Sequence, residues 1–231
     1  MDGYADEMEG FYPLRVPLVV SVAGKQSEDE VRSVIGRLRG LYDVVELNVS
    51  CPNVKGGMAA GTNPQLTALY TKTAKEEAGR KPVVVKLTPN VDGIATIALA
   101  AADAGADGVL AINTILGKYV NPHTLRPHLT NQTGGVSGHN IIDDGLRRVN
   151  EIASALDARG HRIAVGGVGG IRDAHDAKRY MAEGATYVQL GTCLFLDSPM
   201  EKKRFTEPNL ETVEEKLTRF EREMYGNGTA I

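Results

Sequence analysis

The sequence predicts an α/β fold in which helices cover a parallel β-sheet. Six short apolar runs alternate with five longer segments whose aliphatic residues recur at spacings of three and four. Glycine or polar turn residues follow nearly every run. Continuous apolar runs separated by helices are typical of parallel strands that are buried on both faces. We therefore expect a series of βα units.

The expected strands are rich in valine, isoleucine and leucine, which pack well on a covered, pleated surface. Each is too short to be a helix and is followed by glycine, proline or a polar residue. They are Leu18–Ala23, Val44–Val49, Val83–Leu87, Gly108–Ile112, Ile163–Val168 and Tyr187–Leu190.

The expected helices between these strands are amphipathic, with one aliphatic face toward the sheet. They are Ser27–Leu41, Asn63–Ala78, Val91–Ala104, Ile141–Leu156 and Ala174–Glu183. A charged amphipathic helix is expected over Leu210–Tyr225, and residues 226–231 are expected to form a frayed polar tail. No linker divides the chain, so we expect one domain over residues 1–231.

The position of the glycines favours a barrel over a doubly wound sheet. A dinucleotide-binding sheet would carry G-x-G-x-x-G after its first strand, and nothing near Gly24 does so. Glycine pairs instead follow the fifth and sixth strands, at Gly169–Gly170 and Gly191–Thr192. The last two βα loops of a (β/α)₈ barrel form a phosphate site. Only six of the eight strands of such a barrel are found.

Net charge and cysteine content limit the classes of partner and the compartment that we expect. The net charge of -3 and the pI near 6.0 give no broad cationic field for nucleic acid or for an anionic membrane, so a small molecule is the expected partner. Two cysteines far apart do not form a disulfide framework, which fits a reducing cytoplasm. No signal peptide, membrane span or metal-ligand spacing is found.

The run from Glu46 to Lys55 holds the first candidate site. Its strand ends with Asn48, Ser50, Cys51 and Asn53 beside a proline turn. Cys51 is either a small buried hydrophobic residue or a solvent-reachable thiol, and its polar neighbours favour the thiol. No histidine is near in sequence, so a Cys–His hydrolase has no signature here. A cysteine can still act as general base toward an acidified C–H bond.

Two further strand ends carry polar groups. Lys86 lies within an aliphatic strand, where it either snorkels to the surface or faces an anion in the barrel mouth, and the second interpretation is favoured. Asn113–Thr114 either caps a turn or contacts a ligand at the same barrel end.

Glycine segments supply backbone donors for an anion. Gly169–Gly170 and Gly191–Thr192 are each a weak signal alone, but at consecutive strand ends they predict a phosphate nest. The segment Thr133–Gly138 closes a long polar insertion, Leu116–Gln132, which is either an ordinary flexible loop or a cover for the site. Cys193, in an apolar setting, is interpreted as structural.

The motifs resemble those of the flavin-dependent dihydroorotate dehydrogenases and, more distantly, dihydropyrimidine dehydrogenase. The resemblance covers essentially the whole chain in order and spacing. It is carried by Asn48–Asn53, Gly56–Gly57, Gly61–Pro64, Val85–Asn90, Ala106–Gly108, Ile112–Thr114, Gly134–Gly138, Gly169–Ile171 and Gly191–Thr192.

The resemblance implies an eight-stranded barrel that binds FMN and oxidises dihydroorotate to orotate in pyrimidine biosynthesis. It implies that Cys51 is the catalytic base and that Lys86 stabilises the reduced flavin. The implied flavin-binding residues also include Ser21, Asn48, Ile112, Gly138, Gly169, Gly170, Gly191 and Thr192. Asn53, Asn113 and Thr114 would bind the substrate.

The segment after Asn53 looks like the NAD-linked class 1 subgroup, whose catalytic subunits work with a partner that carries FAD and an iron–sulfur cluster. Two cysteines cannot ligate a four-cysteine cluster, so such a cluster would belong to the partner. The resemblance also suggests a homo-oligomer. The electron acceptor stays open between NAD through the partner, fumarate and others.

Full-length relatives carry two strands ahead of the one at Leu18–Ala23, so the sequence predicts a barrel truncated at its N-terminus, with open edges at its first and last strands. Three functions stay open at this point. The first is dihydroorotate oxidation, the second is reduction of uracil or thymine by the same fold, and the third is a non-catalytic flavin-binding protein.

Overall fold

A computed structural model describes residues 16–23, 27–50, 60–127, 129–196, 218–220 and 222–224. Its main feature is a six-stranded parallel sheet with the order β1-β2-β3-β4-β7-β8. The strands are β1 (Val19–Ala23), β2 (Val44–Asn48), β3 (Val83–Lys86), β4 (Gly108–Ala111), β7 (Ala164–Val168) and β8 (Tyr187–Gln189). All six predicted strands are confirmed, each within a residue of its expected ends.

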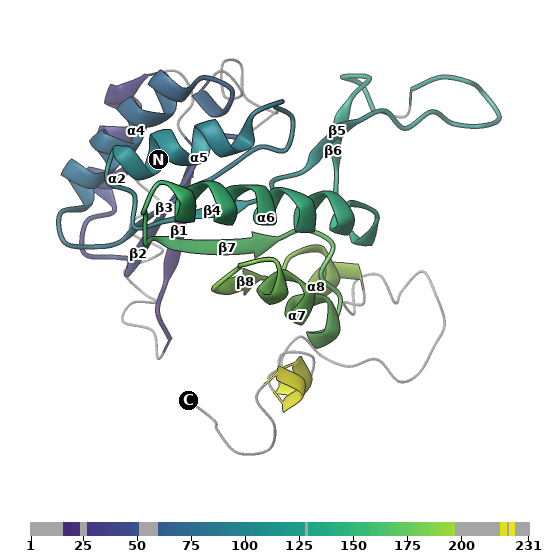
Figure 1. The fold of residues 1–231 in the computed structure, drawn as a ribbon. Helices are drawn as coiled ribbons and strands as arrows, with labels where there is room; N and C mark the ends of the chain where they lie inside the picture. Colours follow the sequence, from purple (N-terminus) through teal and green to yellow (C-terminus); the bar gives the residue numbers. More distant parts are fainter. Residues whose placement is uncertain are drawn as a thin grey trace.

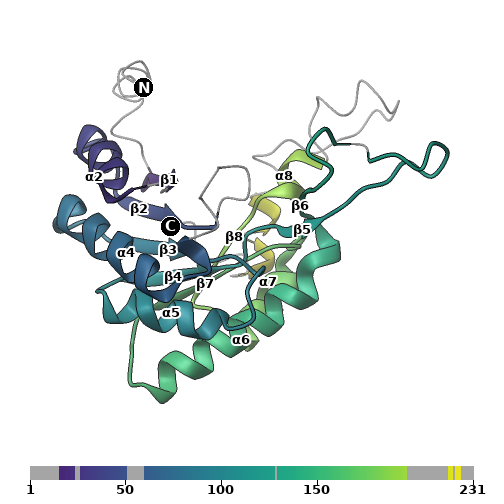
Figure 2. The same ribbon diagram turned by 90° about the horizontal axis from the view of Figure 1, so that it is seen from above.

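The sheet curls into part of a barrel, with helices along its outer face (Figures 1 and 2). The covering helices are α2 (Glu28–Arg37), α4 (Pro64–Ala78), α5 (Ile94–Asp103), α6 (Ile142–Ala158) and α7 (Ala174–Ala182). A 3₁₀ turn, η1 (His139–Ile141), precedes α6, and the short α8 (Thr192–Leu196) follows β8. Each helix returns the chain so that the next strand is parallel to the last.

Side-chain caps fix where several helices begin. Ser27 accepts a hydrogen bond from the Glu30 amide at the start of α2, and Asn63 accepts one from the Leu66 amide at the start of α4. Pro64 is the first residue of α4, where its missing N–H has no intrahelical partner to lose. Asp173 caps α7 in the same way through the Asp176 amide. These caps fix the starts of α2, α4 and α7, which begin within a residue of the predicted positions.

The alternation of each strand separates a core face from a site face. Val20 and Val22 of β1, and Val45 and Leu47 of β2, are buried in the hydrophobic core. The intervening residues point to the concave face, because successive strand side chains point to opposite sides of a sheet. Ser21 and Glu46 meet there, hydrogen bonded to each other. The concave face therefore carries polar groups in the middle of aliphatic strands.

The two ends of the long insertion pair with each other, which the sequence analysis did not predict. Leu116 and Gly117 belong to β5 (Ile115–Gly117), and this strand pairs antiparallel with β6 (Gly134–Val136). This pair begins an arm that projects away from the sheet (Figure 1). The arm also carries exposed apolar side chains, including those of Tyr119 and Leu125, so it is not uniformly polar. Strands of three residues are too short for a periodicity signal.

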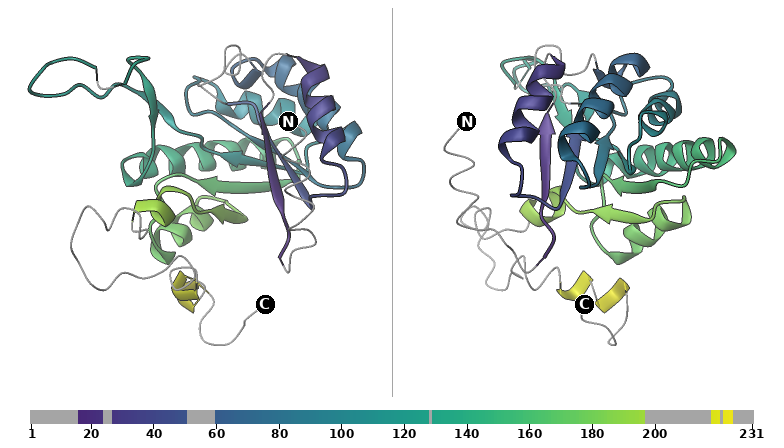
Figure 3. Two further views of the ribbon diagram at one scale, coloured as in Figure 1. Left: turned by 180° about the vertical axis from the view of Figure 1, so that it is seen from behind. Right: turned by 90° about the vertical axis from the view of Figure 1, so that its left-hand side faces the viewer.

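The expected C-terminal helix is described only in part. Residues 218–220 and 222–224 are helical, and Phe220 and Met224 pack against the core. Lys178 of α7 donates a hydrogen bond to the Glu223 carbonyl at 2.9 Å. Figure 3 shows this short helical segment close to β8 and α7. The predicted tail, 226–231, lies outside the described residues, and the single-domain interpretation stays a prediction.

Candidate functional site

Polar side chains meet where β2 and β4 end. The Asn113 side-chain amide donates to Ser50 Oγ at 2.7 Å and to Asn48 Oδ1 at 3.3 Å. Ser50 in turn donates through its hydroxyl to Asn48 Oδ1 at 2.8 Å, and its backbone amide donates to the same oxygen at 3.1 Å. Ser50 is almost fully buried. The carboxyl end of the sheet is therefore held by a connected amide and hydroxyl network.

Asn90 joins the base of the arm to this network and was given no role in the sequence analysis. Its side chain donates to the Thr114 carbonyl at 3.0 Å and accepts from the Leu116 amide at 2.8 Å. Thr88 Oγ1, fully buried, accepts from the Asn90 backbone and side chain. The signal that could have identified Asn90 is an amide three residues beyond the predicted strand end at Leu87, directly after Pro89.

Glycine backbone forms the opposite wall. Gly138, Gly169 and Gly170 have backbone φ values of 88°, 119° and 76°, which residues other than glycine rarely adopt. A Cβ on Gly170 would stand 2.8 Å from the Ile142 side chain and 2.9 Å from its backbone, so the loop after β7 packs directly against the start of α6. At Gly191 no heavy atom of the described residues lies within 4 Å of such a Cβ. The backbone at Gly191 therefore borders open space.

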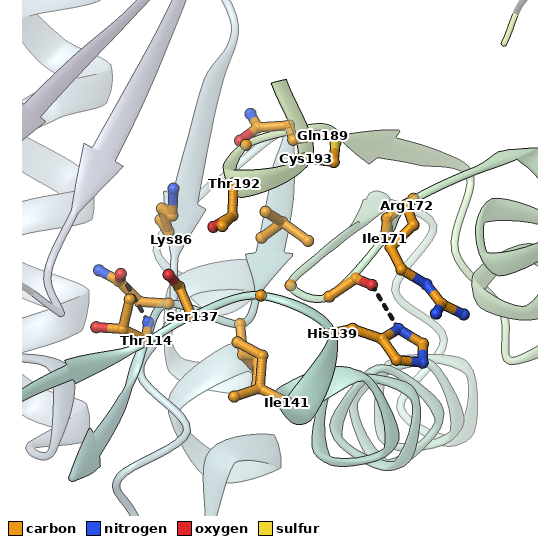
Figure 4. Close-up of a pocket in the computed structure, with 17 residues that line it drawn as sticks. Lys86, Thr114, Ser137, His139, Ile141, Ile171, Arg172, Gln189, Thr192 and Cys193 are labelled. Carbon is orange, nitrogen blue, oxygen red and sulfur yellow. Dashed lines mark hydrogen bonds between the residues drawn. The ribbon is translucent and has the colours of Figure 1, made fainter. Parts of the chain in front are cut away.

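These two walls enclose a cavity of about 180 Å³ (Figure 4). In Figure 4 Lys86 rises from β3 on one side, while Gln189 and Thr192 stand at the end of β8 and the start of α8. Nine predicted site residues line the cavity: Lys86, Ile112, Asn113, Thr114, Gly138, Gly169, Gly170, Gly191 and Thr192. Strands far apart in sequence therefore bring an ammonium, an amide, hydroxyls and glycine amides together.

Two predicted residues lie next to the cavity rather than on its wall. Asn48 is joined to it through Asn113, as described above. Ser21 is joined to it through Glu46, whose carboxylate accepts a hydrogen bond from Ser21 Oγ at 2.7 Å and lies 3.5 Å from Lys86 Nζ. The predicted residues Cys51 and Asn53 lie outside the described residues, so their roles stay predictions.

Glu46 was missed as a site residue although it is almost fully buried, at 4% exposure. Its second carboxylate oxygen accepts a hydrogen bond from Gln189 Nε2 at 2.9 Å. The signal was present in the sequence, because Glu46, Asn48 and Ser50 alternate along one strand face. The reasoning that singled out Lys86, a charge within an aliphatic strand, applies equally to Glu46.

A buried carboxylate supports the loop after β7 from behind. Asp176, 1% exposed, accepts hydrogen bonds at 3.1 Å from both the backbone amide and Nε of Arg172. Burial alone would raise the pKa of Asp176, but the hydrogen bonds and charge of Arg172, with nearby His139, hold that pKa below its usual value. His139 Nδ1 also donates to the Gly170 carbonyl at 3.0 Å. The glycine wall therefore has a charged support.

Cys193 lies at the cavity rather than within an apolar core, while its structural role stays a prediction. The side chain is partly exposed and lines the cavity. The reason is local: β8 ends at Gln189 and α8 begins at Thr192, so Cys193 lies in the first helical turn beside the glycine wall. Sequence reasoning placed it in an apolar run because Leu194 and Phe195 follow it.

Neither a membrane-spanning helix nor a group of metal ligands is found among the described residues. No helix in this part of the chain has the length and apolar character needed to cross a membrane. Within the same residues, no three His, Cys, Asp or Glu side chains gather into a group suited to a metal ion.

Known proteins share both the sequence and the fold. The family described as dihydroorotate dehydrogenase matches residues 3–208. The chain is 44% identical over 185 residues to the dihydroorotate dehydrogenase B (NAD(+)) catalytic subunit of Bacillus thuringiensis (strain Al Hakam), and equally so to that of Bacillus mycoides (strain KBAB4). In both comparisons the aligned region covers 79% of this chain and 58% of the relative. The chain thus spans somewhat over half the length of these curated relatives.

Solved structures agree on the architecture. Dihydroorotate dehydrogenase from Eimeria tenella in complex with ferulenol superposes with a TM-score of 0.69 at 21% identity, covering 94% of this chain and 61% of that one. Its ligand-free form gives a TM-score of 0.68 at 20% identity, and the superposition covers 99% of this chain and 70% of that one. The curled sheet is therefore part of a (β/α)₈ barrel.

A family match over most of the chain and a 44% identical catalytic subunit agree with the NAD-linked class 1 motifs in the sequence. The barrel architecture and the cavity at the carboxyl ends of its strands accord with that assignment. The chain belongs to the dihydroorotate dehydrogenase family.

Proposed function

We propose that this chain oxidises dihydroorotate to orotate, with FMN as the hydride acceptor, in pyrimidine biosynthesis. The observation that carries the proposal is a single cavity in which Lys86 faces a wall of glycine backbone. Its supports are the family match and the names of the curated relatives, which are dihydroorotate dehydrogenase subunits. The roles of the site residues below are proposed from the resemblance and, for the described residues, from their places at the cavity.

The cavity fits the phosphate end of a flavin. Gly138, Gly169, Gly170, Gly191 and Thr192 line it, and backbone amides without side chains can approach a phosphate closely. The volume of about 180 Å³ is below the roughly 300–1,000 Å³ of pockets that enclose a whole ligand. The described residues therefore suit a phosphate and the chain next to it, with Lys86 toward a ring that gains negative charge.

Lys86 supplies the positive charge for that ring. Its side chain is 19% exposed and projects from the end of β3 into the cavity. When bound, a flavin would supply the hydride acceptor, and a nearby ammonium would favour the negative charge of its reduced form. Ser21, Asn48 and Ile112 are proposed to border the same ring.

Amide side chains at the strand ends are proposed to hold the substrate. Asn113 and Thr114 line the cavity, and Asn113 is fixed by Ser50 and Asn48. Primary amides can donate to a carboxylate and to ring carbonyls while accepting from ring N–H groups. Asn53 is proposed as a further contact. These residues orient the reacting carbon before any proton moves.

Cys51 is proposed as the general base. Its thiolate takes the proton from the carbon next to the ring carbonyl, and the electron pair of that C–H bond becomes the new C=C bond. The adjacent carbon loses its hydrogen as a hydride, which carries the electron pair of the second C–H bond to the acceptor. Asn48 and Ser50, three and one residues before Cys51, are fixed by hydrogen bonds, which anchors the strand end that carries the thiol.

Partners follow from the same assignment. The matching relatives are named catalytic subunits, which implies a second subunit. We propose that this subunit carries FAD and an iron–sulfur cluster and passes electrons to NAD, that the chain is a homo-oligomer, and that it acts in the cytoplasm.

The test is anaerobic reduction of the flavin-loaded protein. Dihydroorotate is expected to bleach the visible flavin band and to yield orotate, while dihydrouracil leaves the band unchanged. Cys51→Ala is expected to slow bleaching by about 10²–10⁴-fold while retaining flavin, because proton abstraction loses its base. Bleaching by dihydrouracil alone would contradict the proposal. So would a colourless protein that gains no flavin on incubation with FMN.

A further inference from the structure

The buried carboxylate of Glu46 has no part in the function proposed above. We propose that Glu46 is a positioning residue: it is the buried counter-ion that holds Lys86 at the cavity and sets how strongly that lysine favours the reduced flavin. The second half of this proposal rests on the proposed function, while the first half stands on the pairing of the two side chains.

The contacts of Glu46 come from three other strands. Its Oε1 accepts from Ser21 Oγ of β1 at 2.7 Å and lies 3.5 Å from Lys86 Nζ of β3. Its Oε2 accepts from Gln189 Nε2 of β8 at 2.9 Å. The Glu46 side chain is 5% exposed. Hydrogen bonds from both ends of the sheet thus fix the carboxylate, so it can act as a rigid anchor for a flexible lysine.

The distance to Lys86 leaves the ammonium available to the cavity. A charge-assisted N–H···O bond is about 2.7–2.9 Å long, whereas Lys86 Nζ stands 3.5 Å from Glu46 Oε1. The ammonium has three N–H donors, of which Glu46 engages at most one weakly. Glu46 therefore restrains the position of the charge without consuming its hydrogen-bonding capacity.

The surroundings make the charge of Glu46 effective. Tyr187 lies on the same face of the sheet, and burial together with the charge of Glu46 raises its pKa to about 12. Among the described residues the buried Tyr187 hydroxyl has no hydrogen-bond partner. The carboxylate is 5% exposed and 3.5 Å from Lys86 Nζ, so its negative charge offsets part of the positive field of Lys86 at the cavity.

A purely structural role is the competing explanation, in which Glu46 only ties β1, β2 and β8 together and the ion pair is incidental. The two explanations differ in what a neutral, equally sized side chain does. Glu46→Gln keeps the shape and an acceptor for Ser21 but removes the charge, which leaves the partly buried ammonium of Lys86 without this counter-ion.

The first experiment is a double-mutant cycle on the flavin-free protein, with Glu46→Gln, Lys86→Met and the double variant compared by urea unfolding. If the two side chains are coupled, the folding equilibrium constant of the double variant should be at least about fivefold larger than the value expected when the two single-variant fold-changes are multiplied. If Glu46→Gln does not fold but the double variant does, removal of Lys86 has rescued folding, which also supports the pairing. Additive losses, or a double variant as unfolded as Glu46→Gln, would overturn the pairing.

The second experiment measures the midpoint potential of the bound flavin. Glu46→Gln is expected to favour the reduced form by about tenfold, or about 30 mV for a two-electron couple. Glu46→Asp keeps the charge and should stay within about twofold of wild type. Glu77→Gln is the matched control, because Glu77 of α4 pairs with Arg32 of α2 and with Arg39 in the turn after α2, on the outer face of the sheet.

An unchanged potential in Glu46→Gln, or an equal shift in Glu46→Asp, would overturn the electrostatic role. Failure of the wild-type chain to take up flavin would instead count against the proposed function, and the flavin-free cycle would still decide the pairing.

Discussion

The hydroxyl of Tyr180 donates a hydrogen bond to the Gly169 carbonyl at 2.8 Å and thereby fixes the loop that forms one wall of the cavity. Tyr180 belongs to α7 and is fully buried. Burial strongly raises the pKa of its phenol, so the hydroxyl stays protonated and able to donate. Its ring covers Gly145 of α6 and Gly167 of β7, where no Cβ would fit. One side chain thus joins two helices, a strand and the glycine wall.

Tyr180→Phe is expected to lower the free energy of unfolding by about 0.5–1.5 kcal/mol, since one buried hydrogen bond is lost and the ring remains. The Kd for FMN should rise by no more than about tenfold, because the glycine wall loosens without losing its donors. Urea unfolding and flavin fluorescence titration measure the two effects. Tyr119→Phe, at a position on the arm that is 62% exposed, is the control and should change both quantities less. Unaltered stability in Tyr180→Phe would mean that the Gly169 contact contributes nothing.

Gly145→Ala is expected to destabilise the protein although alanine favours helices by about 1 kcal/mol over glycine. The added Cβ would collide with the Tyr180 phenol, and overpacking a core costs about 1–3 kcal/mol. Because the hydroxyl is the nearest atom, the loss should shrink in a Tyr180→Phe background. Gly36→Ala in α2 is the control: a Cβ there meets only Glu77 Oε2, at 3.5 Å, so it should stabilise. Equal losses in both backgrounds would contradict the clash.

Asp176→Asn is expected to remove part of the pH dependence of stability. The pKa of Asp176 is held below its usual value in the folded state. Its ionised form therefore stabilises the fold above the unfolded-state pKa of about 3.9, and this contribution is lost as pH falls below that value toward the folded pKa. The gap in unfolding free energy between wild type and Asp176→Asn should narrow on acidification.

Urea unfolding at neutral and at acidic pH measures that gap. Asp144→Asn is the matched control, because Asp144 is a surface residue of α6 paired only with Arg147 in the described ion pairs. Its effect should be small at either pH. A gap for Asp176→Asn that widens on acidification would show that the sign of the pKa shift is wrong.

Gly191→Ala and Gly170→Ala should separate binding from folding. A Cβ on Gly191 meets no described heavy atom within 4 Å and would occupy space proposed for the phosphate. This variant should keep the thermal stability of the flavin-free protein and lose FMN affinity by at least about tenfold. Gly170→Ala should lose both, because its positive φ and the Ile142 backbone oppose a side chain. Differential scanning fluorimetry and FMN titration distinguish them, and full FMN affinity in Gly191→Ala would place the phosphate elsewhere.

The strands were predictable because burial on both faces leaves a continuous aliphatic signature. Val83–Lys86 shows this well, since a single lysine interrupts an otherwise apolar strand. The arm was not predictable for the opposite reason. β5 and β6 have three residues each and pair with one another, so neither carries a periodicity long enough to recognise.

Some site residues could likewise be predicted from the sequence, and others could not. Glycine pairs, lone polar residues at strand ends and the family resemblance predict nine of the residues that line the cavity. Glu46 escaped notice because its partners lie far away in sequence: Gln189 is 143 residues distant. The place of Cys193 at the cavity was not predicted, because its surroundings were judged from its neighbours in sequence rather than in space.

The sequence by itself determined the order of strands and helices and the family, because apolar periodicity, caps and glycine motifs are local properties of the chain. Only the tertiary structure decided which polar groups share a wall, how Glu46 meets Lys86, and that the insertion forms an arm. These depend on the curl of the sheet, which brings β1, β2 and β8 together across its concave face. Curl arises from strand twist and packing summed over all six strands, and no single segment encodes it.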